Sequence, residues 1–317
     1  MGAAMSEPTS NKKLLERLGD GARVLIVRLR SLGDCVLTTP AIELLHAARP
    51  DLRIGVVVEP RFAAVFEGNP AVARVLEPSY GSVMGFRASL AINLHGGTRS
   101  MLLTGASLAR WRAGFAHHKG AGLVYNAPIP RAQEVLGVER TVHTAEHLAS
   151  AMFYLGAPVS EIPRARLYAP AAGAASPYAV IHPASAATYK TWNPSGFVEV
   201  AEHIRRRRAL EPVFIGAGQD DLTPFEGYRV VRGAPLKEVM SLIGGASLFV
   251  GNDSGPAHIA AAYGVPAVVL FGRPEHRVIW APWRAERSQT LCAEEGIGTL
   301  GVDEVLAAVD GLGQPRW

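Results

Sequence analysis

The sequence predicts an α/β protein built from two doubly wound, Rossmann-like halves. Short apolar runs typical of buried parallel strands alternate with segments of helical spacing, and this alternation occurs twice along the chain. Residues 156–177, which are rich in Pro, Ala and Gly, separate the two series and mark a linker. We therefore expect an N-terminal domain over residues 1–165 and a C-terminal domain over residues 166–317.

The first half begins with an apolar run at residues 23–29, which predicts a buried strand. A loop over residues 30–34 leads to a helix expected at 37–48, with Pro40 in its first turn. Further apolar runs at 54–58 and 90–94 predict two more strands of the same sheet.

The second half repeats the alternation after the linker. We predict strands at 178–181 and 212–215 and helices at 195–208 and 236–243, followed by a strand–turn–helix–strand unit over 248–272. The four arginines at 205–208 end the first of these helices, where they complement its dipole and form a solvated face. Residues 303–310 predict a last helix, for which packing back on the first domain is one arrangement.

Composition describes a globular protein. Of 317 residues, 48% are hydrophobic and 19% are charged, which is unlike a disordered chain. No apolar run reaches the roughly 20 residues that a membrane-spanning helix needs, and the first residues lack the apolar core of a secretory signal. The two cysteines, Cys35 and Cys292, build neither a disulfide framework nor a cysteine-rich metal site. We therefore expect a cytoplasmic protein.

The charge is unevenly distributed. Residues 1–170 carry 19 Lys and Arg against 13 Asp and Glu, whereas residues 171–317 carry 13 against 15. Residues 78–133 contain no carboxylate at all, but they contain six Lys or Arg and three His. Such a one-sided stretch indicates an anionic partner, with scattered solvated arginines as the alternative. Few aromatic residues accompany the basic ones, and no nucleic-acid motif is present, so we expect no nucleic-acid partner.

The turn within residues 248–272 is the most informative motif. Asp253, Ser254 and Gly255 follow an apolar strand, and Pro256 suits the first turn of the helix after them. Ligands of open α/β sheets bind at such strand ends, and exposed amides at a helix start favour phosphate. His258, one turn later, adds a hydrogen-bond donor. The alternative is an ordinary helix capped by Asp253 or Ser254.

Asp34 places one carboxylate after the first strand, in the sequence Arg28-Leu29-Arg30-Ser31-Leu32-Gly33-Asp34. A carboxylate at a ligand-facing strand end serves as a general base. The alternative is an N-cap for the helix expected near residue 37. Only Gly33 is present here, and the fingerprint of a dinucleotide-binding turn is missing, so a nicotinamide or flavin cofactor and a dehydrogenase are disfavoured.

Two further loops of the second half carry polar groups. After the strand at 178–181, Ser185, Thr188 and Lys190 supply two hydroxyls and one cation suited to a diphosphate, although Lys190 also fits a surface position. No Gly-Lys-Ser/Thr occurs, which excludes a P-loop. After the strand at 212–215, Asp220 follows Gly216-Ala217-Gly218 and is a candidate for ribose hydroxyls, or for an ordinary helix start.

Taken together and in this order, these motifs resemble glycosyltransferase family 9, the ADP-heptose:lipopolysaccharide heptosyltransferases. The resemblance runs from residue 23 to about 283 and is carried by VLIVRLRSLGDCVLTTPAI, VVVEPRFAAVFEGNPAVARVL, HPASAATYKTWNPSGF, VFIGAGQDD and FVGNDSGPAHIAAAYGVPAVVLFG. It implies a GT-B fold, in which two Rossmann-like domains face each other across a cleft. It also implies transfer of heptose from a nucleotide donor with inversion at the anomeric carbon.

The resemblance assigns roles to individual residues. Asp34 matches the catalytic base, and Lys190 and Ser185 match contacts to the donor phosphates. The donor-binding loop matches Asp253, Ser254, Gly255 and His258. On the acceptor side, the family implies roles for Arg99 and His143.

The sequence departs from the family pattern at two places. Arg273-Pro274-Glu275-His276 replaces a common Pro-Thr/Ser-Asp-Pro turn, and Tyr189 stands where small or charged residues are frequent. Both departures concern the donor side of the site.

The expected activity is transfer of a heptose from a nucleotide-diphosphate donor, ADP-heptose, to an anionic, lipid-linked acceptor of the lipopolysaccharide-core type. The donor is a substrate, and neither a cofactor nor a metal is expected. A lipid-linked acceptor implies peripheral contact with the inner face of the inner membrane. The alternatives are another GT-B enzyme with a different donor sugar, a sugar-nucleotide epimerase, or an inactive nucleotide-sugar binding module.

Overall fold

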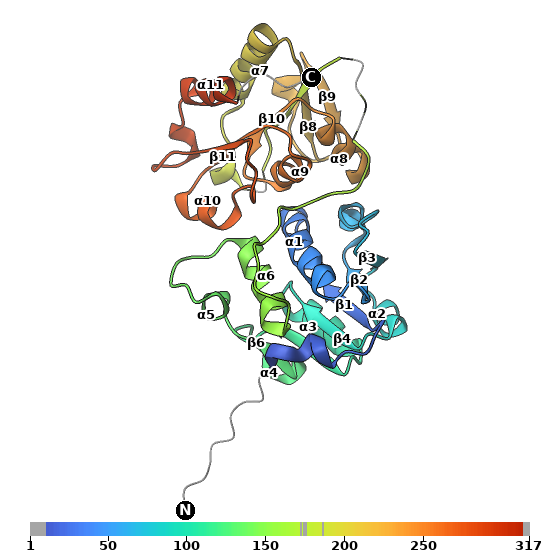
Figure 1. Cartoon of the computed structure of the whole chain (residues 1–317). Coiled ribbons are helices and arrows are strands. Elements are labelled where there is room, and N and C mark those ends of the chain that lie inside the picture. The colour runs from blue at the N-terminus through green and yellow to red at the C-terminus, as the bar shows by residue number, and fades with distance from the viewer. Residues whose placement is uncertain (1–10, 172, 174–175, 186, 313–317) are drawn as a thin grey trace, which may run out of the picture. The chain divides into compact units, whose positions relative to one another are not determined.

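The computed structural model describes residues 11–171, 173, 176–185 and 187–312. Residues 1–10, residues 172 and 174–175 of the predicted linker, Ala186 of the loop after 182, and residues 313–317 lie outside the described residues. The chain divides into two compact units (Figure 1). The first takes in the residues up to Arg30, Pro40–Pro60 and Pro70–Pro163, and the second Ser31–Thr39, Arg61–Asn69 and the residues from Arg164. The predicted domain boundary at residue 165 stays a prediction.

The described part of the first unit contains a six-stranded parallel sheet in the order β3-β2-β1-β4-β5-β6. Its strands are β1 (Arg23–Val27), β2 (Arg53–Val57), β3 (Val72–Leu76), β4 (Leu90–Asn93), β5 (Trp111–Phe115) and β6 (Ala127–Ile129). The connecting helices are α1 (Leu32–Ala48), α2 (Tyr80–Phe86), α3 (Thr98–Ala106), α4 (Ala121–Val124), α5 (Ala132–Leu136) and α6 (Thr144–Leu155), with short 3-10 turns η1 (Asn11–Arg17) and η2 (Pro60–Val65). The start of α1, up to Thr39, and η2 from Arg61 on are counted with the second unit.

The described part of the second unit contains another six-stranded parallel sheet, in the order β12-β11-β10-β7-β8-β9. Its strands are β7 (Tyr178–His182), β8 (Glu211–Gly216), β9 (Arg229–Arg232), β10 (Leu248–Asn252), β11 (Ala267–Phe271) and β12 (Ser288–Cys292). The helices are α7 (Pro194–Arg208), α8 (Leu236–Gly244), α9 (Gly255–Tyr263), α10 (Pro274–Trp280) and α11 (Val302–Gly311), with 3-10 turns η3 (Thr188–Lys190), η4 (Thr223–Phe225) and η5 (Ile297–Thr299).

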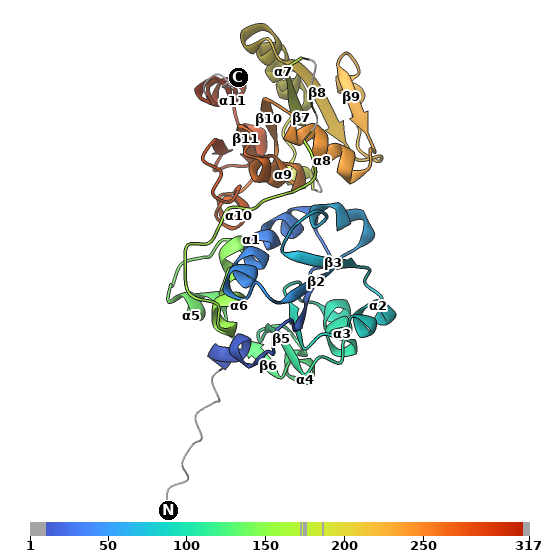
Figure 2. The ribbon, with the colours of Figure 1, turned by 45° about the vertical axis from the view of Figure 1, so that its right-hand side comes forward.

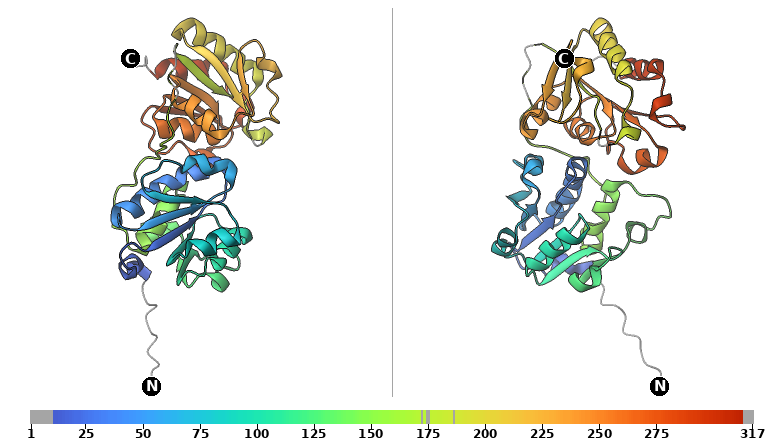
Figure 3. Two further views of the ribbon diagram at one scale, coloured as in Figure 1. Left: turned by 90° about the vertical axis from the view of Figure 1, so that its right-hand side faces the viewer. Right: turned by 180° about the vertical axis from the view of Figure 1, so that it is seen from behind.

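Helices cover both faces of the second sheet, which is why its strands read as continuous apolar runs. β7, β10 and β11 are buried along their whole length. Residues of α7 and α11 join one face of the sheet in a single core cluster, and α8 packs beside α9 on the other face (Figures 2 and 3). This doubly wound α/β arrangement confirms the predicted fold class.

The last helix packs within the second unit. α11 contacts α7 and β11, and Val305, Ala308 and Val309 enter the core cluster of that unit. Nε2 of His203 in α7 lies 2.8 Å from Oδ1 of Asp310, and the Arg208 guanidinium donates to the Val309 carbonyl. The apolar face of α11 is therefore buried within the second unit, and packing on the first domain stays a prediction.

Helix α1 begins earlier than its sequence indicated. We expected a start at residue 37 because Pro40 is typical of a first turn, but the helix starts at Leu32 and Pro40 lies inside it. Proline removes the N–H that would bond the Val36 carbonyl. The Thr39 hydroxyl donates to that carbonyl instead, at 2.8 Å. The helix therefore continues through Pro40.

Candidate functional site

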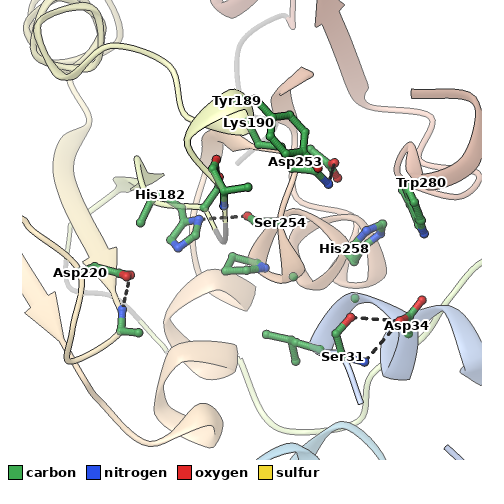
Figure 4. Close-up of a pocket in the computed structure, with 18 of the residues that line it drawn as sticks. Ser31, Asp34, His182, Tyr189, Lys190, Asp220, Asp253, Ser254, His258 and Trp280 are labelled. Carbon is green, nitrogen blue, oxygen red and sulfur yellow. Dashed lines mark hydrogen bonds and ion pairs between the residues drawn. The ribbon is translucent and has the colours of Figure 1, made fainter. Parts of the chain in front are cut away.

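A cavity of about 540 Å³ opens at the carboxyl ends of the strands in the second unit. Its lining comes from the start of α1 (residues 31–34), the loop after β7, the loop after β8, the start of α9, and Trp280 of α10 (Figure 4). All of these segments belong to the second unit. The place fits the rule that ligands of open α/β sheets bind where the strand order reverses, here between β7 and β10.

The turn between β10 and α9 has the backbone form expected of an anion site. Ser254 is the N-cap of α9, but its side chain makes no capping hydrogen bond to that helix. The Ser254 hydroxyl instead lies 3.0 Å from Nδ1 of His182. Burial lowers the pKa of His182 to about 4, so its ring is neutral at pH 7. The amides at the start of α9 consequently have no competing side-chain cap.

Lys190 lies over this turn. Its Nζ is 2.7 Å from Oδ2 of Asp253 and 5.2 Å from the centre of the Trp280 ring. The loop that carries Lys190 is anchored by Trp192, whose backbone N–H donates to Asn252 Oδ1 and whose Nε1 donates to the Leu300 carbonyl. The ion pair with Asp253 fixes the ammonium at the cavity, where its other protons can meet a phosphate.

The hydroxyls predicted beside Lys190 differ in position. Ser185 lines the cavity, but its Oγ already donates to the Ala187 carbonyl at 2.8 Å and lies 3.0 Å from Thr191 Oγ1. Thr188 is exposed and is not among the residues that line the cavity. The predicted phosphate contact of Thr188 therefore has no support from its position, and Ser185 chiefly shapes the loop.

Asp220 lines the cavity on the side of β8. Its carboxylate accepts the backbone N–H of Ala217 at 2.7 Å, and its own N–H donates to the Ala217 carbonyl at 3.1 Å. This pair of bonds closes the turn after β8, so the alternative reading as a helix start is wrong. A carboxylate with free lone pairs beside the cavity can still accept a ribose hydroxyl.

Asp34 lies in the first turn of α1, not in the loop before it. Its carboxylate accepts the Ser31 N–H at 3.3 Å and the Ser31 hydroxyl at 3.1 Å (Figure 4). A carboxylate at this position reaches back to the residue that starts the helix, as in a capping box. The alternative that Asp34 caps a helix starting near residue 37 is therefore wrong. Asp34 both orders the start of α1 and lines the cavity.

Two glycines allow the start of α1 to lie against the start of α9. A Cβ on Gly33 would fall 2.6 Å from Cδ2 of His258, and a Cβ on Gly255 would fall 2.7 Å from Cβ of Leu32. Burial lowers the pKa of His258, while the neighbouring Asp253 and Asp34 carboxylates raise it. Within the described residues His258 Nδ1 has no hydrogen-bond partner. The cavity thus brings Asp34 and His258 together with Asp253, Ser254, Gly255 and Lys190.

The two acceptor-side predictions, Arg99 and His143, lie in the first unit. Arg99 is exposed in the first turn of α3, 3.6 Å from Oε1 of Glu59. His143 is buried as the N-cap of α6, and its Nδ1 accepts the Ala145 N–H at 3.0 Å. His143 therefore has a capping role that its sequence did not indicate, because histidine is not a usual N-cap residue. Its acceptor role stays a prediction.

The structure adds residues that sequence reasoning passed over. His182 and Trp280 line the cavity of the second unit. In the first unit the His147 ring stacks on Phe115, with centroids 3.9 Å apart, and burial lowers its pKa to about 4. The only sequence signal for His182 was its place directly after the apolar run at 178–181. Among the described residues no group of His, Cys, Asp and Glu is arranged to hold a metal ion, and no described helix is long and apolar enough to cross a membrane.

Comparisons with known proteins agree on one family. Residues 83–299 match the family model described as glycosyltransferase family 9 (heptosyltransferase). The chain is 27% identical to lipopolysaccharide heptosyltransferase 3 of Escherichia coli K12, over 80% of this chain and 83% of that one. It superposes on a glycosyl transferase family 9 structure from Veillonella parvula with a TM-score of 0.82 at 21% identity, covering 96% and 99% of the two chains. An E. coli heptosyltransferase solved with ADP gives a TM-score of 0.75 at 20% identity, covering 92% and 100%. At these identities the two structures establish the GT-B fold.

Proposed function

Because this chain belongs to glycosyltransferase family 9 (heptosyltransferase), we propose that it transfers a heptose from ADP-heptose to an anionic saccharide acceptor of the lipopolysaccharide-core type. The chain is a glycosyltransferase, as its family is. The donor, the acceptor and the stereochemistry are the proposed parts. A solved heptosyltransferase of the same fold carries ADP, and the cavity of the second unit has the groups that a nucleoside diphosphate needs.

One observation carries the proposal. A carboxylate from α1 lines the same cavity as a lysine and an uncapped helix start, although these groups are far apart in the sequence. Inverting transfer requires a base that serves the acceptor hydroxyl and a cationic site that receives the leaving group. Asp34 supports the first requirement, and Lys190 with the start of α9 supports the second.

The proposed reaction is a single displacement at the anomeric carbon. The acceptor oxygen forms a bond to that carbon as its proton passes to the Asp34 carboxylate. On the opposite face the bond from the anomeric carbon to the diphosphate oxygen breaks, and ADP leaves with the electron pair. The added negative charge on the diphosphate is met by the Lys190 ammonium and by the N–H groups of α9. Attack opposite the leaving group inverts the configuration.

The remaining donor contacts follow from the lining of the cavity. Asp220 is placed to accept a ribose hydroxyl, and His258 faces Asp34 across the glycine contact described above. The diphosphate charge is met by protein groups in this proposal, so turnover should persist in the presence of a chelator. Location in the cytoplasm, with peripheral contact at the inner membrane, belongs to the same proposal.

The experiment is a panel of nucleotide sugars assayed with and without a heptose-accepting core saccharide. Release of ADP should occur with ADP-heptose and should depend on the acceptor, and NMR of the product should report an inverted anomeric centre. An epimerase would change the donor without any acceptor, and an inactive binding module would bind ADP-heptose without turnover. Either result would overturn the proposal.

A further inference from the structure

Large apolar side chains are exposed on three neighbouring helices of the first unit. Tyr80 and Met84 of α2 and Leu102 of α3 are each about half exposed. Leu108, just after α3, and Leu123 of α4 are 74% and 93% exposed. α3 contacts both α2 and α4, and the three helices lie side by side in every view (Figures 1, 2 and 3). We call these five residues the α2–α4 surface.

The core does not need these side chains. Val83 and Phe86 form the buried side of α2, and Leu103 does so for α3, in one cluster with the strands of the sheet. Ala121 and Tyr125 bury the base of α4 against Met101. Each helix therefore buries other apolar side chains, α2 and α3 in the cluster with the strands and α4 against Met101 of α3, and the fold itself leaves the five exposed residues uncovered.

The segment that carries the α2–α4 surface is rich in cations. All five residues of the surface lie within residues 78–133, which contain no Asp or Glu. Arg87 at the end of α2, Arg110 before β5 and Lys119 before α4 are exposed. Among the described residues no carboxylate forms a salt bridge with any of these three. Five exposed apolar residues thus lie among uncompensated cations.

We propose that the α2–α4 surface docks on an anionic lipid bilayer, with Leu102, Leu108 and Leu123 entering the headgroup region and Arg87, Arg110 and Lys119 meeting anionic headgroups. Apolar side chains combined with cations are what peripheral membrane binding requires. The inference rests on the proposed function in one respect: docking on a bilayer would bring the enzyme to a lipid-linked acceptor.

Charge argues against a second copy of the chain as the occupant. A two-fold dimer pairs the same patch of both subunits. Here that would bring two sets of arginines and lysines together with no carboxylate from residues 78–133 between them. An anionic bilayer complements the same charges.

The test uses the full chain and vesicles without any saccharide acceptor. Vesicles of phosphatidylcholine with about 30% phosphatidylglycerol should carry the protein upward in a flotation gradient, and vesicles of phosphatidylcholine alone should not. Arg87→Gln/Arg110→Gln/Lys119→Gln should weaken binding roughly 100-fold, since each cation near such a surface contributes about tenfold or less. Leu102→Gln/Leu108→Gln/Leu123→Gln should weaken binding at least about tenfold.

Matched controls lie elsewhere on the chain. Arg205→Gln/Arg206→Gln/Arg207→Gln removes the same charge from α7, and Val159→Gln removes another exposed apolar side chain. Both should bind the mixed vesicles within about threefold of the unchanged protein. Because all substituted positions are exposed, thermal melts should show that every variant is folded.

The inference is overturned if the unchanged protein does not float with the mixed vesicles, or if the α7 variant loses as much binding as the α2–α4 variants. A change of oligomeric state by light scattering, with vesicle binding unaltered, assigns the surface to a second copy. An acidic protein that binds the surface while vesicles do not would also overturn it. ADP release with a lipid-free acceptor tests the proposed function separately, because the leucine variant should keep that turnover.

Discussion

Asn93 at the end of β4 and Asn252 at the end of β10 occupy the same place in their two sheets, but they hold different partners. Both side chains are buried beside the central strand of their sheet. Asn93 accepts the N–H groups of His95 and Gly96, at 3.0 and 3.1 Å, in the turn that follows its own strand. Asn252 instead accepts from Trp192 and donates to the Pro183 carbonyl, at 3.2 and 2.7 Å, in the loop after β7.

This difference determines what each strand end can bind. In the first unit the asparagine uses amides of the turn that leads into α3. In the second unit the asparagine holds the Lys190 loop, and the turn into α9 keeps its amides for a ligand. Two sheets of equal strand order therefore present different chemistry where their order reverses, because one side chain is used on different loops.

The largest expected effect concerns Asp34, which lines the cavity at the strand ends of the second unit. Asp34→Asn should lower kcat by roughly 10²-fold or more and leave ADP affinity nearly unchanged, because removal of a base acts on the transition state. Steady-state kinetics measures kcat, and calorimetry measures the affinity for ADP. Since Asp34 also orders the start of α1, Ser31→Ala is the matched control for that capping contact and should retain most of the turnover. Near-normal turnover of Asp34→Asn would leave only the capping role.

The two asparagines should separate stability from ligand binding. Asn93→Ala should lower the free energy of unfolding by about 3 kcal/mol, since it leaves several buried polar partners unpaired. Asn252→Ala breaks fewer bonds and should cost about 2 kcal/mol, but it should also weaken ADP binding by loosening the Lys190 loop. Urea unfolding and ADP calorimetry on both variants measure this. If Asn93→Ala weakened ADP binding and Asn252→Ala did not, the assignment of Asn252 to the ligand site would be wrong.

The pH dependence of stability should involve a histidine from each unit. The pKa values of His182 and His147 are lowered to about 4 from 6.5, mainly by burial. A lowered histidine pKa means that the unfolded chain binds the extra proton first. The stability is therefore complete above pH 6.5 and is lost as the pH falls from 6.5 toward 4. For His182 the loss should reach about 3 kcal/mol. His182→Asn should remove this part of the slope in unfolding measured across that window, whereas an unchanged slope would exclude His182 as its source.

Lys190→Ala should weaken ADP binding by about 2 kcal/mol, roughly 30-fold, through loss of a charge-assisted hydrogen bond. Its ion pair with Asp253 adds a second consequence, because the variant leaves that carboxylate facing the diphosphate. Lys190→Ala/Asp253→Asn should therefore recover part of the affinity. Calorimetry measures the ADP affinity of each variant. Equal affinity in the unchanged protein and in Lys190→Ala would show that Lys190 does not bind the donor diphosphate. Lys237→Ala, at an exposed ion pair outside the cavity, is the control.

The smallest effect is expected at Arg99 in the first unit. Arg99→Ala should raise the acceptor KM a few-fold and leave the donor KM unchanged, with the loss shrinking as salt screens the exposed charge over about 8–10 Å. Kinetics at several salt concentrations measure this. Arg131→Ala, at another exposed arginine of residues 78–133, is the control. A change in the donor KM alone would move Arg99 to the donor side.

Much of the fold could be read from the order of residues. The apolar runs predicted β1, β2, β4, β7, β8, β10 and β11 closely, since strands covered on both faces are apolar along their length. The strands β3, β5, β6, β9 and β12 were missed, because they are short or less buried and mix polar or small residues with apolar ones. α1 was placed five residues late, because one hydroxyl bond at Thr39 overrides the usual meaning of Pro40.

The sequence by itself determined the alternation of strands and helices and the polar turns that follow them, since both depend on neighbouring residues. Only the tertiary structure decided which of these turns meet. Lys190 pairs with Asp253 across 63 positions, and His182 contacts Ser254 across 72. The tertiary structure also shows that His143 caps α6 and that Thr188 is not among the residues lining the cavity. Such contacts depend on strand order and on packing between distant segments, which no local pattern of residues specifies.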